Sequence, residues 1–440
     1  MLDTCEFALS QAKSLGVDEA EVYAESNRII RIVIQNNSID LARSDINEGI
    51  GIRAFKRYGL GYASCNSLLE GDVKTTVKNA ISFASAALRD PANYLPSQQK
   101  IEKFNIFDPE SETFCMENGL EFAVRLLDSA RKDKRVSIDS GGFEATIQKR
   151  AIASSKGVRE EESLNYFVYY LMGMAREKDR VSSFDLEFDA TRWVKEIDVE
   201  RIGRSLADKV LASLGAEKGK CFKGSILLSP DAVESIVIRP LISAVNANNV
   251  QKGMSRFVGK LGSSVASSLF TLVDNGTIKG GIGTESFDRE GMPHRRLSLI
   301  EKGVLSSFMY NAYAANREGR DTTGHAQGGT RSVPRIGPTN MIVSPGDTAK
   351  DDIIREIKQG VIVTRFSGFP NPITGDFSGV VKGGFLIENG RVIKPLIGTL
   401  ISGNIYKGLK NISAISKEIK KLANFILPYV RIDNISVTSR

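Results

Sequence analysis

Two breaks in the hydrophobic periodicity constrain most strongly how this chain can fold. The first break, residues 90–110, contains three prolines and follows neither a helical nor a strand repeat. The second break, residues 215–219, begins and ends with glycine. Because 440 residues exceed the length of an ordinary single domain, we expect three units, at residues 1–95, 110–215 and 222–440.

The first two units share a pattern of helix, strands and helix. In the first, apolar residues at helical spacing from Cys5 to Leu15 predict a helix that Gly16 ends. Strands are predicted at 22–24, 28–34, 49–55 and 60–65, followed by a helix over 69–88. In the second, helices are predicted near 114–127 and 202–214, with strands near 135–155, 164–176 and 181–188 between them.

The third unit begins with a predicted strand, 224–228, that runs directly into a helix. Ser229 is placed as the N-cap and Pro230 as the first helical residue. Hairpins are predicted at 299–303 and 386–390, the second through an Asn-Gly turn. The predicted fold class is α+β, with N-terminal α/β-type segments that contain antiparallel sheets and a larger, mainly antiparallel β C-terminal domain.

Charge and hydropathy exclude several classes of protein. The chain carries 59 basic and 52 acidic residues, but they are mixed and no basic block reaches five residues, so we expect no nucleic-acid partner. No apolar run approaches the roughly 20 residues that cross a bilayer, and acidic Asp3 and Glu6 stand where a signal peptide would begin. We therefore expect a cytoplasmic protein with no membrane partner. Its four cysteines form no Cys-x-x-Cys pair and are predicted to be free thiols.

The familiar catalytic motifs are missing from the sequence. His294 and His325 are the only histidines, and neither has a second histidine at helical spacing. There is no phosphate-binding loop of the Walker type and no Gly-x-Ser-x-Gly nucleophile elbow. We therefore predict no catalytic residue, no metal ligand and no cofactor in this chain.

Residues 276–337 form the most distinctive polar segment, with 11 of the chain's 40 glycines in 62 positions. Glycine permits tight turns and close backbone approach, which suits a binding loop. One interpretation of residues 324–331 is a loop that brings backbone amides against a peptide or an anion; the alternative is an ordinary surface loop with a solvated histidine. The candidate peptide or cleft contacts are Arg295, Arg296, Tyr313, His325, Thr330 and Arg331.

Several glycine-containing motifs resemble the TldD/PmbA family. They lie, in the family's order, at residues 49–55, 253–262, 288–324, 371–377 and 385–390. In that family, the TldD branch carries a His-Glu-x-x-x-His helix and a cysteine ligand near the C-terminus, whereas the PmbA (TldE) branch lacks both. Here the corresponding helix, 231–245, contains no histidine, and the last cysteine is Cys221. Residues 430–437 also resemble the PmbA ending, so the resemblance is to the PmbA branch.

This resemblance implies a function. A PmbA-like chain is expected to be a non-catalytic subunit of a cytosolic TldD–TldE zinc metallopeptidase, a heterodimer that processes unfolded or modified peptides. Zinc is then expected on the TldD-like partner, and this chain is expected to help hold an extended peptide by adding it to a strand edge. Two alternatives stay open: a homodimer that binds peptides without cleaving them, and a hydrolase with non-standard catalytic residues.

Overall fold

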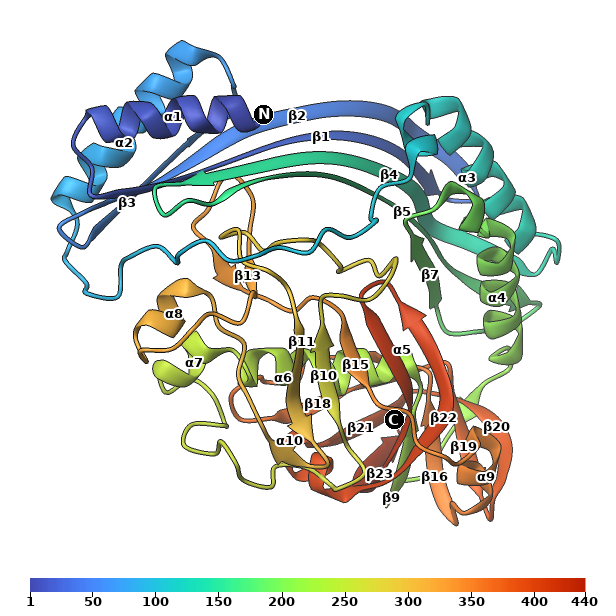
Figure 1. The fold of residues 1–440 in the computed structure, drawn as a ribbon. Coiled ribbons are helices and arrows are strands. Elements are labelled where there is room, and N and C mark those ends of the chain that lie inside the picture. Colours follow the sequence, from blue (N-terminus) through green and yellow to red (C-terminus); the bar gives the residue numbers. More distant parts are fainter. Residues whose placement is uncertain (440) are drawn as a thin grey trace.

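The computed structural model describes residues 1–439 and has two layers, a long curved sheet that arches over a C-terminal body (Figure 1). The sheet has seven strands in the order β3-β2-β1-β4-β5-β6, with β7 also paired to β5. Every pairing in it is antiparallel. The strand bounds are β1 Glu19–Gln35, β2 Ser38–Lys56, β3 Gly59–Cys65, β4 Val136–Ser154, β5 Arg159–Glu177, β6 Arg180–Val181 and β7 Asp185–Thr191.

Four helices cover the convex face of this sheet. Helices α1 (Leu2–Ser14) and α2 (Glu70–Ala86) lie over one half, and α3 (Met116–Ala130) and α4 (Val199–Ala212) over the other (Figure 1). Alternate residues of β1, such as Val22 and Ile32, enter these two apolar clusters, and the residues between them face the C-terminal body. Strands from residues 1–95 and 110–215 therefore share one sheet, because β1 pairs with β4. The division of the chain into three separate units stays a prediction.

Two strand predictions are wrong in detail. The predicted strands 22–24 and 28–34 form one continuous β1, because the polar residues between them are paired on both sides by β2 and β4. The predicted strand 181–188 is divided into β6 and β7, and β7 extends to Thr191 because it pairs along β5. The proline-containing segment between α2 and α3 crosses beneath the sheet (Figure 1) and includes a short 3-10 helix, Pro109–Glu112.

The C-terminal body is built on a 14-stranded sheet with the order β12-β11-β10-β15-β23-β9-β16-β19-β20-β8 and four further strands attached. Most of its pairings are antiparallel, which confirms the predicted α+β class with a mainly antiparallel β C-terminal domain. The bounds are β8 Glu217–Lys218, β9 Phe222–Leu228, β10 Leu272–Asn275, β11 Arg296–Glu301, β12 Val304–Leu305, β15 Met341–Val343, β16 Gln359–Val363, β17 Arg365–Ser367, β18 Asp376–Lys382, β19 Gly384–Glu388, β20 Arg391–Ile397, β21 Thr399–Asn404, β22 Ile412–Leu422 and β23 Phe425–Ser439.

Shorter elements complete the body. The two-stranded sheet β13 (Ala326–Gln327) and β14 (Arg335–Ile336) lies between body and arch (Figure 1). Both predicted hairpins are confirmed, and Asn389 and Gly390 adopt the positive φ angles, 47° and 75°, that an Asn-Gly turn requires. The small helices are α7 Ala247–Gln251, α8 Ala312–Asn316, α9 Lys350–Arg355 and α10 Ile405–Gly408, with 3-10 turns at Val194–Glu196 and Leu409–Asn411.

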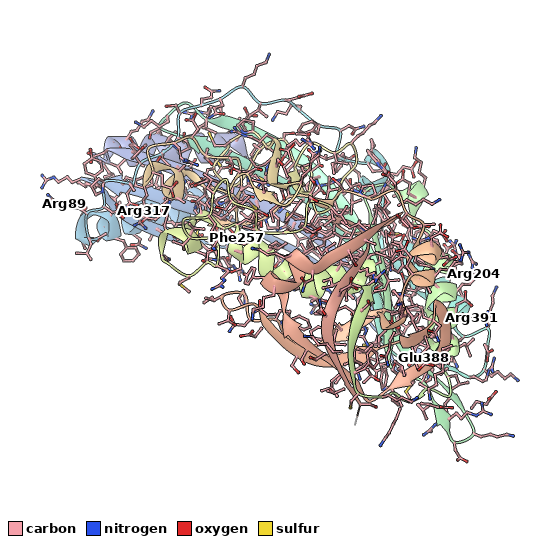
Figure 2. All side chains as sticks on the ribbon, turned by 90° about the horizontal axis from the view of Figure 1, so that it is seen from below. Arg89, Arg204, Phe257, Arg317, Glu388 and Arg391 are labelled. Carbon is pink, nitrogen blue, oxygen red and sulfur yellow. The ribbon has the colours of Figure 1, made fainter. Side chains whose placement is uncertain are left out.

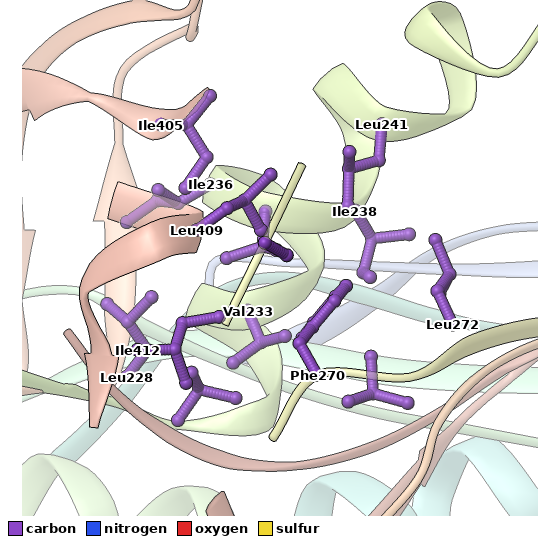
Figure 3. Packing of buried hydrophobic residues seen from close by; sticks show 14 of the residues in the cluster. Leu228, Val233, Ile236, Ile238, Leu241, Phe270, Leu272, Ile405, Leu409 and Ile412 are labelled. Carbon is purple, nitrogen blue, oxygen red and sulfur yellow. The ribbon is translucent and has the colours of Figure 1, made fainter. Parts of the chain in front are cut away.

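A continuous central helix runs through the core of the body. It consists of α5 (Pro230–Val233), a π-helical turn (Glu234–Ile238) and α6 (Arg239–Ala244). Ser229 caps it by accepting the Ala232 amide, as predicted. Figure 3 shows the buried side chains of this helix packed among apolar residues of β9, β10, α10 and β22, such as Leu228, Leu272 and Ile412. Within residues 1–439, no helix is both long and apolar enough to cross a membrane.

Candidate functional site

Buried charges join the concave face of the sheet to the glycine-rich segment. Arg53 on β2 pairs with Glu21 on β1 and, at 2.8 Å, with Glu290, and all three side chains are at most 6% exposed. Arg289 donates through Nη1 to Glu21 at 2.8 Å. Burial alone would raise the pKa of Glu21, but Arg53 and Arg289 outweigh it and hold that pKa below its ordinary value. This cluster is a fixed ionic link between the two layers.

A second charge cluster lies farther along the concave face, where β4 pairs with β5. Arg150 pairs with Glu162 and, at 2.7 Å, with Glu285, and its guanidinium stacks 4.6 Å from the centre of the Phe287 ring. Burial would raise the pKa of Glu285, but the Arg150 cation lowers it to about 2. The His294 ring lies 4.0 Å from Glu285, which raises the histidine's pKa although burial opposes this. Glu285 is therefore ionised near neutral pH.

A polar cavity of about 460 Å³ opens between the layers at these clusters. Its volume is in the range of small-molecule sites. Strands β1 and β4 line one side, and the glycine-rich segment lines the other with charged side chains and bare backbone. The lining residues are Tyr23, Glu25, Gln148, Arg150, Ile282, Gly283, Glu285, Arg289, His294, Ala326, Gln327, Gly328, Gly329, Pro338, Thr339 and Asn424.

A second cavity, of about 660 Å³, lies at the other end of the interface. Tyr313 is the only one of the six predicted contacts found there, and five asparagines also line this cavity: Asn93, Asn246, Asn248, Asn249 and Asn311. The Tyr313 hydroxyl donates to Asp90 at 2.7 Å, so the phenol is held in place by the loop after α2. The Ala92 amide and Tyr313 both bond to Asp90 and lower its pKa.

The predicted loop 324–331 approaches the sheet closely. Tyr62 of β3 donates to the Thr330 carbonyl at 2.6 Å, and the Thr330 side chain is buried. Gly51 of β2 makes this approach possible, because a Cβ there would lie 2.7 Å from the same carbonyl oxygen. The interpretation of this segment as a surface loop with a solvated histidine is wrong, since His325 is 0% exposed and its Nε2 lies 3.0 Å from Asp274.

The six predicted contact residues do not form one site. Arg295, Arg296 and Arg331 are exposed, and Arg295 donates to the Thr322 carbonyl at 2.9 Å. His325 is buried in the body, and Tyr313 and Thr330 lie at different parts of the interface. Their role as peptide contacts stays a prediction.

Sequence reasoning missed the buried charged residues of the two clusters, some of which line the 460 Å³ cavity. A signal for them was present, because Glu21, Arg53 and Arg150 each stand beside apolar residues in otherwise regular strand patterns. A charge in such a position is buried only when it is paired. The partners, Glu290 and Glu285 among them, lie in the segment that the glycine content had already singled out.

The central helix does not offer the donor set of a zinc site. A structural or catalytic zinc takes three or four histidine, cysteine or carboxylate ligands. Within residues 1–439, no group of three such side chains is arranged to hold a metal ion. Val233, Ile236 and Ile238 of the central helix are fully buried among apolar neighbours (Figure 3). The residues present therefore do not fit a zinc ion.

Comparisons with known proteins agree over nearly the whole chain. The models of PmbA/TldA metallopeptidase domain 1, central domain and C-terminal domain match residues 20–84, 91–214 and 222–439. An uncharacterised protein of Methanocaldococcus jannaschii is 29% identical over 413 residues, 94% of each chain, and a metalloprotease PmbA homolog of Buchnera aphidicola is 23% identical over 100% of this chain and 97% of its own.

The fold also matches a solved structure. The crystal structure of TldE from Thermococcus kodakarensis superposes with a TM-score of 0.91 and 26% sequence identity, covering 99% of this chain and 100% of that one. The resemblance to the PmbA (TldE) branch, which lacks the zinc-binding motif, is thereby confirmed. The chain belongs to the PmbA/TldA metallopeptidase family.

Proposed function

We propose that this chain is the non-catalytic subunit of a heteromeric zinc metallopeptidase of the TldD–TldE type. In this proposal a TldD-like partner carries the zinc ion and cleaves the peptide bond. This chain supplies part of the wall that encloses an extended, unfolded or modified peptide. The four free cysteines fit a reducing compartment, and we place the complex in the cytoplasm.

The observation that carries the proposal is the packing of the central helix. The side chains of Val233, Ile236 and Leu241 are 0% exposed within one apolar core cluster. Glu234, on the outer side of the helix, is paired with Arg239 through a 2.7 Å contact. A hydrolytic zinc needs an open coordination position and polar ligands, and this environment supplies neither.

Relatives of both branches support a second subunit. The chain is 23% identical to a metalloprotease PmbA homolog and 24% identical to a metalloprotease TldD homolog, both of Buchnera aphidicola. Haemophilus influenzae likewise has one relative of each name. Two relatives of different branches in one organism are what a two-component enzyme requires.

The chemistry of the interface suits a peptide bound through its backbone. Five asparagines line the 660 Å³ cavity, some of which, such as Asn246 and Asn249, also bond within the chain. The 460 Å³ cavity is lined by Gly328 and Gly329. Amide groups donate and accept hydrogen bonds with any peptide unit, whatever its side chain. Such walls would hold unfolded chains with little sequence preference.

The test is gentle purification of the tagged chain from its own cells, followed by native mass measurement and zinc analysis. The proposal predicts a second, TldD-like chain in the complex, with zinc bound to that chain. A homodimer without metal would support a peptide-binding protein instead, and zinc in a homodimer would support a hydrolase with non-standard residues. Either result would overturn the proposal.

Variants of two predicted peptide contacts, Tyr313 and Arg331, refine this test. Tyr313→Ala and Arg331→Ala should slow peptide cleavage by the reconstituted complex without releasing the partner. Arg204→Ala is the control, because Arg204 is an exposed residue of α4 that lies near the edge of the molecule in Figure 2 and lines neither cavity. Equal cleavage by all three variants would show that these contacts do not hold the peptide.

A further inference from the structure

Arg289 is buried with three of its five N–H donors unpaired among the described residues. Its side chain is 2% exposed, and Nη1 donates to Glu21. Nε and Nη2 have no hydrogen-bond partner among the described residues. The guanidinium is held flat over the Tyr23 ring, 4.0 Å from its centre. Buried donors without partners are rare and costly in folded proteins, so this edge of Arg289 needs an explanation.

The unused edge has the geometry of a carboxylate receptor. Nε–H and Nη2–H point the same way along one side of the planar guanidinium and form the fork that binds a carboxylate through both oxygens. Arg289 is among the residues lining the 460 Å³ cavity. Within the cluster Arg289 pairs with Glu21, which it shares with Arg53. The nearby Tyr62 hydroxyl donates its proton to the Thr330 carbonyl, and although its oxygen is still an acceptor, neither Nε nor Nη2 of Arg289 has it as a hydrogen-bond partner.

A second unsatisfied charge lies in the same cavity. Glu25 is two residues beyond Tyr23 on the same face of β1, and its carboxylate takes part in no ion pair among residues 1–439. Its contacts with the Thr330 amide and hydroxyl are long, at 3.5 and 3.4 Å. The loop approaches Glu25 closely, since a Cβ at Gly329 would lie 2.9 Å from Glu25 Oε1. Both long contacts are to Oε1, so the carboxylate keeps acceptor sites for an N–H group of a ligand.

We propose that the 460 Å³ cavity binds an α-carboxylate together with its neighbouring nitrogen, as presented by a free amino acid or by the last residue of a peptide. The carboxylate lies on the Nε and Nη2 edge of Arg289. The ammonium group of an amino acid, or the amide N–H of a peptide end, donates to Glu25. All residues of this site belong to this chain, so ligand binding can be tested without a partner subunit and independently of the proposed peptidase role.

The probes for this site are L-alanine, tri-alanine and tri-alanine with an amidated C-terminus, titrated calorimetrically into the full chain. Charged, bidentate hydrogen bonds are among the strongest in proteins, and the loss of one should weaken binding roughly tenfold or more. Saturable binding of either free carboxylate, with the amide at least about tenfold weaker, supports the site. Tighter binding of alanine identifies a free amino acid as the ligand, and tighter binding of tri-alanine identifies a peptide end.

Variants locate the binding in the cavity. Arg289→Lys keeps a positive charge for Glu21 but removes the fork, and Glu25→Gln removes the unpaired carboxylate. Each should weaken binding of the tighter probe about tenfold. The control is Glu48→Gln, an exposed position on β2, and it should bind as the unaltered chain does. Equal binding of tri-alanine and its amide, no saturable binding of either carboxylate, or unchanged binding by Glu25→Gln would overturn the proposal.

Discussion

Replacing Arg53 by methionine should loosen the attachment of the curved sheet to the C-terminal body. Methionine keeps the length of the side chain but removes the cation that Glu21 and Glu290 share. Both carboxylates are at most 1% exposed, so the substitution leaves two buried negative charges, and only Glu21 retains a partner, through Arg289. Arg53 on the sheet forms an ion pair with Glu290 of the C-terminal body, and the variant removes this pair between the two layers.

The magnitude follows from the two contacts that are lost. A hydrogen bond to a charged group contributes about 1.5–3 kcal/mol, and breaking a buried ion pair by removing one partner costs about 3–5 kcal/mol. We expect Arg53→Met to lower the free energy of unfolding by about 3–5 kcal/mol. The double variant Arg53→Met/Glu290→Gln should recover part of this loss, because it removes one of the stranded charges.

Urea titration measures the free energy of unfolding of each variant, with the fluorescence of the single tryptophan, Trp193, as the reporter. Trp193 lies at the junction of the layers, where a Cβ on Gly280 would be 3.3 Å from its indole nitrogen. The control is Arg43→Met on the same strand, whose pair with Asp45 is 47% and 43% exposed; it should cost at most about 1 kcal/mol. Equal losses in the two variants would refute the claim that buried charge joins the layers.

Three further predictions test other parts of the structure. Gly51→Ala should lower the free energy of unfolding by about 1–3 kcal/mol, because the new Cβ would collide with the Thr330 carbonyl. Gly71→Ala, where a Cβ meets nothing within 4 Å, should be neutral or slightly stabilising in a melting experiment. Burial raises the pKa of Cys5 to about 12, so iodoacetamide at pH 8 should label the other three cysteines of the native protein and reach Cys5 only in denaturant, as mass spectrometry would reveal. The Arg150 cation lowers the pKa of Glu285 from its ordinary 4.5 to about 2, although burial opposes this. The stability that ionised Glu285 contributes is therefore complete above pH 4.5 and is lost as the pH falls towards 2. Glu285→Gln should flatten that part of an acid-unfolding curve.

Local signals in the sequence predicted local structure well. Gly16 ends the first helix, Ser229 caps the central one, and the Asn-Gly turn at Asn389 joins two strands, as expected. Each of these features depends on residues a few positions apart, whose capping and turn preferences can be read from the residue types alone. The membership of the family was also readable, from glycine motifs spread over most of the length.

The candidate site was not predictable in the same way. Arg53 and Glu290 are 237 residues apart in the chain, and nothing local to either residue identifies the other. The continuity of β1 through its polar middle depends on pairing with β2 and β4 on both sides. His325 looked like a loop residue and is fully buried, because Asp274 of β10 supplies its partner. Tertiary pairing decided each of these outcomes.

The most direct test of the central claim is a peptide-cleavage assay with three samples: this chain alone, its TldD-like partner alone, and the two mixed in equal amounts. Each sample receives zinc and an unfolded peptide, and cleavage is followed by mass spectrometry. The account predicts no cleavage by this chain alone and faster cleavage by the mixture than by the partner. Zinc-dependent cleavage by this chain alone, or a partner that is fully active without it, would contradict the account.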